Sequence, residues 1–309
     1  MLVFKGNTEE LKKIGEEVQK GKIVAFPTDT VYGLGASIEH IDSVRRVFEV
    51  KDRPLDSAII ILIDEIGSME RLAFVDNPKV YDLAKEFWPG ALTLILPKKD
   101  IVDPVISAGG SSVGIRIPDN DIARELIKYS GGALATPSAN KNGQLSPTRA
   151  EHVISQFSHG EIDYLVDGGK TKKSIESTIL DMTCNPPKIL RNGGVSKEEI
   201  ERIIGEVDEL SQKKKSVKTF QKELRFIKKD ELSKLPKDAV LLCLKEIENF
   251  GIKKVEFLSK EGNLEEAVEN LYDILHKLIK EDTNIIYVEE LEEKGLGKLI
   301  MERIEKIVK

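Results

Sequence analysis

Two positively charged motifs have the residue types and spacing that bind anionic ligands. In the segment VKDRP, Lys51 and Arg53 lie two positions apart, so in an extended chain both side chains project to one side and suit a polyphosphate. A surface charge pair is the plain alternative. In the apolar run VGIRI, Arg116 needs an anionic partner, which is either a substrate carboxylate or a protein one. The sequence therefore predicts an anion-binding site.

Further polar segments adjoin apolar strands, where an α/β scaffold presents its ligand groups. FPTDTVYGLGA (26–36) offers hydroxyl and carboxylate groups. ATPSANKNGQLSPT (135–148) offers hydroxyls and amides, and its Ser146-Pro147 pair predicts a helix start that favours an anion. STI (177–179) and ILRNGG (189–194) place a serine at a strand start and an arginine at a strand end. The candidate residues in these segments are Thr28, Asp29, Thr30, Thr136, Ser138, Asn140, Ser146, Thr148, Ser177 and Arg191.

Other kinds of site find little support in the sequence. GGKTKKS ends like a phosphate-binding P-loop, but the first glycine of that motif would fall on Tyr164. The four histidines lack metal-ligand spacing. Cys184 and Cys243 have no C-x-x-C partner, so neither a zinc site nor a disulfide framework is expected. No protein side chains are predicted to hold a metal.

The elements that must position these groups alternate in a mixed α/β order. The near-continuous apolar character of the strand candidates indicates burial on both faces of a sheet. Helices are predicted from a capping box of Asn7 and Glu10, from Asn77-Pro78, from Ser146-Pro147 and from Ser196. The strand candidates are residues 23–26, 58–63, 91–96, 113–117, 164–166, 177–182 and 188–190.

A change in charge density divides the chain. About 27% of residues 1–205 are charged, against about 42% of residues 206–309. Residues 206–229 show little apolar periodicity and are predicted to be a linker. Residues 230–309 alternate apolar runs with helical periodicity, which predicts a small α/β domain of Rossmann-like type. Its expected strands are 239–244, 253–258 and 285–288, and its expected helices are 263–280 and the residues from 295 onward.

Length and composition limit the classes of protein. The chain has 309 residues, of which 40% are hydrophobic and 32% charged, so it suits two domains or one large α/β unit. No apolar run reaches the roughly 18 residues that span a bilayer, and the first residues lack a secretion signal. The net charge of −6 argues against general nucleic-acid binding, although a local basic face for RNA stays open. We expect a cytoplasmic protein without a membrane partner.

Taken together and in this order, the polar segments resemble those of the YrdC-like family, and the smaller second domain resembles its long, two-domain form. The resemblance implies an α/β fold with a YrdC-like twisted mixed sheet and flanking helices in residues 1–205, and a small α/β domain in residues 230–309. It implies nucleotidyltransferase activity, an L-threonylcarbamoyladenylate synthase reaction that uses L-threonine, bicarbonate or CO₂ and ATP and releases pyrophosphate. Mg²⁺ would accompany ATP. A downstream tRNA threonylcarbamoyl transferase would use the product.

The resemblance also implies a role for each motif. Lys51, Arg53 and Arg191 would act by positioning and charge stabilisation, because the carbamate of threonine itself attacks ATP and no covalent nucleophile is needed. No general base is predicted. The implied threonine contacts are Thr30, Arg116 (to the carboxylate), Thr136 and Ser177. The implied ATP contacts are Lys51, Arg53, Ser57, Ser112, Ser138, Asn140, Ser146 and Arg191.

Two features depart from the family pattern. After K-x-R-P many members continue with Asn-Pro-Leu and a histidine five residues after that Asn, where this chain has Ser57 and Leu62. The linker motif K-Y-R-H-Y-A-P of the long form has no counterpart in SVKTFQKELRF. Two alternatives therefore stay open. One is a non-catalytic or weakly active RNA-binding or regulatory protein, and the other is a carbamoyl-adenylate-forming enzyme, although such enzymes normally carry cysteine-rich regions.

Overall fold

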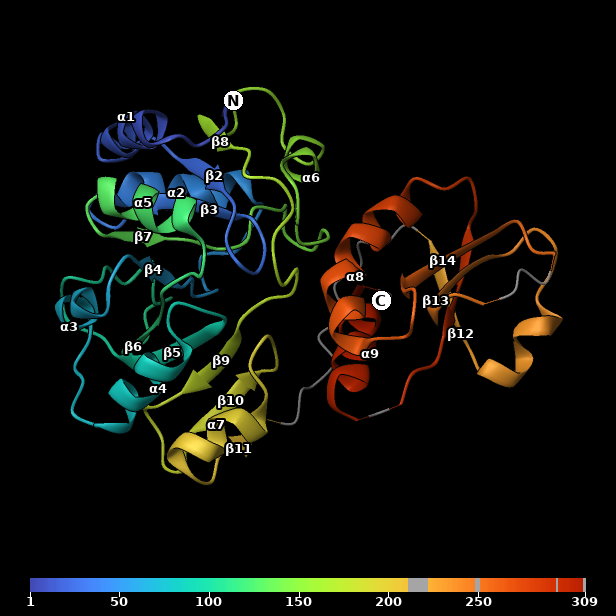
Figure 1. The fold of residues 1–309 in the computed structure, drawn as a ribbon. Coiled ribbons are helices and arrows are strands. Elements are labelled where there is room, and N and C mark those ends of the chain that lie inside the picture. The colour runs from blue at the N-terminus through green and yellow to red at the C-terminus, as the bar shows by residue number, and fades with distance from the viewer. Residues whose placement is uncertain (211–221, 248–250, 293, 308–309) are drawn as a thin grey trace. The chain divides into compact units, whose positions relative to one another are not determined.

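The chain forms two compact units, each with its own sheet (Figure 1). The computed structural model describes residues 1–210, 222–247, 251–292 and 294–307. The larger unit consists of Met1–Asn142 and Ser146–Gln212, and the smaller one mainly of Lys213–Lys309. Residues 211–221, the centre of the predicted linker, lie outside the described residues.

The large unit is built on one mixed sheet with helices on both faces, as the sequence predicts. Its helices are α1 (Thr8–Val18), α2 (Ile41–Val50), η1 (Ile66–Ser68), α3 (Met69–Leu72), α4 (Lys79–Phe87), α5 (Asp121–Tyr129), α6 (Ala150–Ile154) and α7 (Lys197–Ile204). Its strands are β1 (Leu2–Phe4), β2 (Val24–Phe26), β3 (Gly33–Ser37), β4 (Ile61–Ile63), β5 (Leu92–Pro97), β6 (Ser112–Arg116), β7 (Ala133–Ala135), β8 (Tyr164–Val166), β9 (Thr178–Asp181), β10 (Lys188–Arg191) and β11 (Asp208–Glu209).

The strand order of this sheet is β1-β8-β2-β3-β7-β4-β6-β5-β9-β10-β11. Parallel pairs such as β4 with β6 alternate with antiparallel pairs such as β4 with β7 and β5 with β6. Strands that are distant in the sequence thus become neighbours at the centre. The loops that follow β2 and β7 and the segments around β6, β9 and β10 can therefore contribute to one site.

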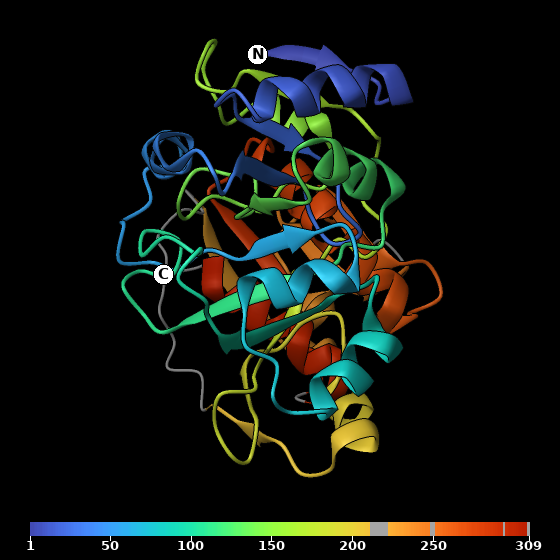
Figure 2. The same ribbon diagram turned by 90° about the vertical axis from the view of Figure 1, so that its left-hand side faces the viewer.

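Burial on both faces follows from the side-chain alternation of the strands. Leu62 of β4 packs in the cluster formed by α1 and α5, whereas its neighbours Ile61 and Ile63 belong to the larger cluster on the other face. Helices α1 and α5 lie side by side (Figures 1 and 2). They approach closely at Gly15, where a Cβ atom would lie 2.5 Å from Cβ of Tyr129.

The local signals of two helix starts are confirmed. The Asn7 side chain accepts a bond from the Glu10 amide at 3.0 Å, and Ser196 forms the same capping box with Glu199. The helix predicted from Ser146-Pro147 is wrong, because α6 begins only at Ala150. The hydroxyl of Ser146 donates instead to the carboxylate of Glu176, at 2.8 Å.

The main element missed by the sequence analysis is β3, which falls in the glycine-rich segment after β2. Its glycines have no side chains, so this segment packs closely against its neighbours as a strand and does not form a loop. A Cβ atom at Gly33 would lie 2.5 Å from Cγ2 of Thr136, and one at Gly35 would lie 2.8 Å from Cε1 of Phe26. Strands β1 and β7 and helices α2 and α5 were also not predicted.

The small unit is a parallel α/β sandwich of Rossmann-like type, with strand order β12-β15-β13-β14. Buried side chains such as Leu241 and Cys243 of β13 form part of its core. Both cysteines of the chain are free thiols. The elements of the small unit are β12 (Glu223–Ile227), η2 (Lys229–Lys234), β13 (Val240–Lys245), β14 (Lys254–Ser259), α8 (Leu264–Ile279), β15 (Ile285–Glu289) and α9 (Gly295–Ile307).

The segment predicted as a linker contains ordered strands at both ends. β11 at Asp208–Glu209 pairs with β10, and β12 at Glu223–Ile227 pairs with β15. Short strands rich in charged residues carry too little apolar periodicity to be recognised from the sequence. None of the helices in the described ranges, 1–210, 222–247, 251–292 and 294–307, has the length and apolar character needed to cross a membrane.

Candidate functional site

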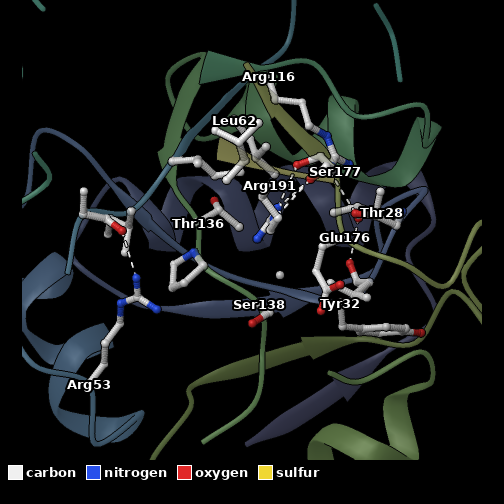
Figure 3. A pocket seen from close by; sticks show the side chains of 18 residues that line it. Thr28, Tyr32, Arg53, Leu62, Arg116, Thr136, Ser138, Glu176, Ser177 and Arg191 are labelled. Carbon is white, nitrogen blue, oxygen red and sulfur yellow. Dashed lines mark hydrogen bonds between the residues drawn. The ribbon is translucent and has the colours of Figure 1, made fainter. Parts of the chain in front are cut away.

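A cavity of about 200 Å³ lies at the strand ends of the large unit (Figure 3). It has room for a small organic molecule, since one water needs only about 10–15 Å³ of such space. Its walls come from the loops after β2 and β7, the segments before β4 and β9, and the last residues of β6 and β10. The predicted site residues that line it are Thr28, Thr30, Arg53, Arg116, Thr136, Ser138, Ser177 and Arg191.

Arg116 ends β6 and lies almost fully buried, with 4% of its side chain exposed. Its Nη2 forms an ion pair with the Oδ1 of Asp29, and its Nη1 donates to the Oγ1 of Thr30 at 2.9 Å. The anionic partner that the sequence requires is therefore supplied by the protein. The Asp29 side chain has no exposed surface, so this pair is a fixed part of the cavity wall.

The hydroxyls after β2 form a short network that fixes this wall. Thr28 Oγ1 lies 3.0 Å from Thr30 Oγ1 and donates to the carbonyl of Val31 at 2.7 Å. The three consecutive polar residues thus bond to one another or to Arg116 while lying almost wholly out of water. These bonds hold the buried cluster in one geometry, although Oδ2 of Asp29 and Nε of Arg116 have no hydrogen-bond partner among the described residues.

Arg191 and Ser177 meet because β9 and β10 pair antiparallel. Arg191 Nε and Nη2 donate to the carbonyl oxygen of Ser177 at 3.0 and 2.8 Å, and Nη2 lies 3.1 Å from Ser177 Oγ. That hydroxyl also lies 2.7 Å from Thr93 Oγ1. Figure 3 shows Arg191 pointing toward Ser177 from the strand beside it.

Arg53 lies in another part of the cavity, apart from Arg116 and Arg191 (Figure 3). Its Nη2 donates to the carbonyl of Ala58 at 2.9 Å, so the guanidinium also supports its own loop. Burial lowers the pKa of Arg53 below its ordinary value, while nearby Asp56 acts in the opposite direction.

Lys51 does not project with Arg53, which corrects the prediction of an extended segment. Helix α2 ends at Val50, and Lys51 keeps a helical conformation as its C-cap. Asp52 then adopts a positive φ of 53°, so the two cationic side chains diverge. Lys51 is 2% exposed and is not among the lining residues, and its Nζ donates to the carbonyls of Ser138, at 2.5 Å, and Asn140. Burial lowers the pKa of Lys51 to about 7.

Four further predicted contacts lie outside the cavity lining. Ser57, Asn140 and Ser146 lie next to it: the carbonyl of Ser57 faces Arg53 Nε at 3.4 Å, that of Asn140 accepts from Lys51, and Ser146 bonds to a lining residue. Ser112 begins β6, at the end opposite to Arg116. Over five strand residues this is roughly 13 Å, so the structure does not bring Ser112 to the cavity.

The structure adds lining residues that the sequence analysis did not single out, chiefly Tyr32 and Glu176. Tyr32 donates its hydroxyl to the carbonyl of Gly169 at 2.7 Å, and burial raises the pKa of its phenol. Lys173, four residues further along, donates its amide to the carbonyl of Asp29 at 2.7 Å. The segment rejected as a P-loop therefore covers the loop after β2. Glu176 could have been noticed as a carboxylate directly before Ser177.

Leu62 also lines the cavity, with 2% of its surface exposed. At the position where many family members have a histidine, this wall is therefore apolar. Metal ligands are sparse: among the described residues no three His, Cys, Asp or Glu side chains are grouped so as to hold an ion. Glu176 is the acidic residue among those that line the cavity.

Comparison with known proteins identifies the family. The Sua5_yciO_yrdC model, described as telomere recombination, matches residues 16–193, and the model of the threonylcarbamoyl-AMP synthase C-terminal domain matches residues 195–306. The threonylcarbamoyl-AMP synthase of Pyrococcus abyssi is 38% identical, over 94% of this chain and 91% of that protein. The chain belongs to the family of threonylcarbamoyl-AMP synthases. It is therefore an enzyme of the nucleotidyltransferase class.

Other threonylcarbamoyl-AMP synthases agree with this assignment. The Bacillus subtilis enzyme is 35% identical, over 97% of this chain and 93% of its own. The crystal structure of Pyrococcus abyssi Sua5 in complex with L-threonine has a TM-score of 0.87 at 33% identity and covers 99% of this chain and 96% of that one. Both units of the chain therefore have the fold of a two-domain threonylcarbamoyl-AMP synthase.

Proposed function

We propose that this enzyme makes threonylcarbamoyl-AMP from L-threonine, bicarbonate or CO₂ and ATP, and releases pyrophosphate. The observation that carries the proposal is one cavity lined by Arg116, Arg53 and Arg191 in a chain of this family. An amino-acid carboxylate and a polyphosphate both need cationic hydrogen-bond donors. The solved complex of Pyrococcus abyssi Sua5 with L-threonine supports threonine as the amino acid.

The threonine end is proposed to be the wall that holds Arg116. Its guanidinium has five N–H donors, and the bonds to Asp29 and Thr30 use two of its nitrogens once each, so donors remain for a carboxylate. Thr30, Thr136 and Ser177 add hydroxyls to the same cavity and suit the hydroxyl and amino groups of threonine.

The ATP end is proposed to be formed by Arg53, Ser138 and Arg191, which line the cavity. Ser57 supports Arg53 through its carbonyl, whereas the carbonyl of Asn140 accepts from Lys51 and Ser146 donates to Glu176, another lining residue. Two arginines can neutralise the pyrophosphate as it leaves, which lowers the barrier without any protein nucleophile.

The reaction balances without a covalent enzyme intermediate. The neutral amine of threonine adds to CO₂ and releases one proton to solvent, which gives a carbamate. An oxygen of the carbamate attacks the α-phosphorus of ATP, and the bond from that phosphorus to the pyrophosphate oxygen breaks. The residues present fit Mg²⁺ that arrives with ATP, since Glu176 offers one carboxylate and Mg²⁺ keeps phosphate and water ligands. When bound, Mg²⁺ would supply further charge stabilisation of the phosphates.

The product is a mixed anhydride, which is readily hydrolysed, so an acceptor must follow. We propose that a separate tRNA threonylcarbamoyl transferase uses it to modify an adenosine of tRNA. The decisive experiment is product analysis by mass spectrometry together with pyrophosphate release. Threonylcarbamoyl-AMP should form only when threonine, bicarbonate, ATP and Mg²⁺ are all present. Pyrophosphate release at the same rate without threonine, or ADP as product, would contradict the proposal.

A further inference from the structure

We propose that Lys51 is a positioning residue that fixes the segment 138–142 beside the ATP end of the cavity, and that it does not contact phosphate. The inference rests on the proposed nucleotide site, because Ser138 of this segment is one of its lining residues. Lys51 is tied to the segment in both directions. Its Nζ donates to the carbonyls of Ser138 and Asn140, and its own carbonyl accepts the amide of Asn142 at 2.6 Å.

The direction of the Lys51 side chain excludes a simple phosphate contact. The residue is 2% exposed and is absent from the cavity lining, whereas Arg53 belongs to that lining. A buried ammonium group is costly unless its N–H donors are used, and here two of the three donate to backbone oxygens. Reaching a phosphate would break these bonds and leave two backbone carbonyls, of which that of Asn140 is buried, without that donor.

Two neighbouring contacts also connect the segment 138–142 to the end of α2 and to the loop after β2. The next residue, Asp52, lies 3.6 Å from the Nζ of Lys141. The amide of Ala139 donates to the carbonyl of Tyr32 at 2.7 Å, which ties the segment to the loop after β2. The end of α2, the segment 138–142 and the loop after β2 therefore form one framework, with the ammonium of Lys51 at its centre.

The test compares Lys51→Met with Arg53→Met as a matched control that removes a cation from the cavity itself. Backbone hydrogen exchange of residues 138–142 is measured without any ligand. In Lys51→Met we expect exchange there to rise about tenfold or more, because the carbonyls of Ser138 and Asn140 lose their donor. In Arg53→Met the exchange of 138–142 should stay unchanged.

ATP binding is then measured by calorimetry at several salt concentrations. We expect ATP affinity to fall about tenfold in both variants. The dependence of ATP affinity on salt concentration should become weaker only in Arg53→Met, because only this variant loses a charge that contacts ATP. At saturating ATP, kcat of Lys51→Met should return to near the wild-type value, which a general loss of folded protein would not give. Normal exchange at 138–142 with a salt dependence reduced as in Arg53→Met would overturn the inference.

Acetylation of lysines in the wild-type protein tests the inference even if Lys51→Met does not fold. Acetylation reports whether the Lys51 amine can be reached by a reagent, because a side chain that is 2% exposed is shielded from it. We expect Lys51 to stay unlabelled with and without ATP, while exposed Lys13 is labelled in both. Labelling that occurs without ATP and is blocked by ATP would mark a phosphate contact. The exchange experiment needs no nucleotide, so a failure of ATP binding alongside the expected exchange would count only against the proposed function.

Discussion

The buried cations in and beside the cavity are stabilised by two different kinds of partner. Arg116 lies beside a full negative charge on Asp29, whereas Lys51 and Arg53 donate to neutral backbone carbonyls. Removing Arg116 strands a buried carboxylate, which costs about 3–5 kcal/mol. Removing Lys51 strands only carbonyl groups, which costs about 1–3 kcal/mol. The free-energy cost of removing a buried cation therefore depends on whether its partner is a carboxylate or a backbone carbonyl.

Arg116→Ala should give the largest effect. We expect threonine affinity to fall about thirtyfold to nearly a thousandfold, since a charge-assisted contact is lost. The thermal midpoint should fall as well, because the buried Asp29 side chain loses its ion-pair partner. Calorimetry with threonine and with ATP, combined with a melting curve, measures both effects. Unchanged threonine affinity would remove Arg116 from the threonine site.

The double variant Asp29→Asn with Arg116→Ala separates the two roles of this pair. It removes the stranded carboxylate, so much of the lost stability should return while threonine affinity stays low. If the double variant regained threonine affinity, the loss in Arg116→Ala would reflect disorder of the wall and not a missing contact.

The next largest effect should be a pH dependence of stability that comes from Lys51. Burial lowers the pKa of Lys51 from 10.5 to about 7, so between these values the unfolded chain binds more protons than the folded one. The free energy of unfolding should then rise with pH, by about 1 kcal/mol per pH unit between pH 7.5 and 9. Urea denaturation of wild type and Lys51→Met checks this, since the variant lacks this contribution. Parallel pH profiles of the two proteins would contradict it.

Ser177→Ala should have a moderate effect near Arg116. The hydroxyl bonds to Thr93 and Arg191 are lost, but Arg191 keeps its two bonds to the Ser177 carbonyl. We expect threonine affinity to fall about three- to tenfold and stability by about 1 kcal/mol. Titration and denaturation of the variant provide the measurement. A loss as large as that of Arg116→Ala would show that the hydroxyl, and not the backbone, holds Arg191.

Ser112→Ala should have the smallest effect. Ser112 starts β6, at the opposite end from the cavity, so threonine and ATP affinities should stay within about twofold of wild type. The same titrations measure this. A clear loss of ATP affinity would restore the role that the family resemblance implies and would mean that ATP extends well beyond the cavity.

Local features of this protein were determined by the sequence alone. The capping boxes at Asn7 and Ser196 depend on residues three positions apart. The strands that end at Arg116 and Arg191, and the strand that follows Ser177, are visible as apolar runs. The polar motifs at the strand ends also indicated the family, because residue types and their order are visible without coordinates.

Only the tertiary structure decided which partner each charged side chain binds. Arg116 and Asp29 are 87 positions apart and meet because β6 and the loop after β2 end in the same cavity. Lys51 and Arg53 are two positions apart, yet they separate because the chain leaves α2 through a positive φ at Asp52. The sequence determines which charged side chains are present and how far apart they lie along the chain. Backbone conformation and long-range strand pairing determine where these side chains point and which residues they contact.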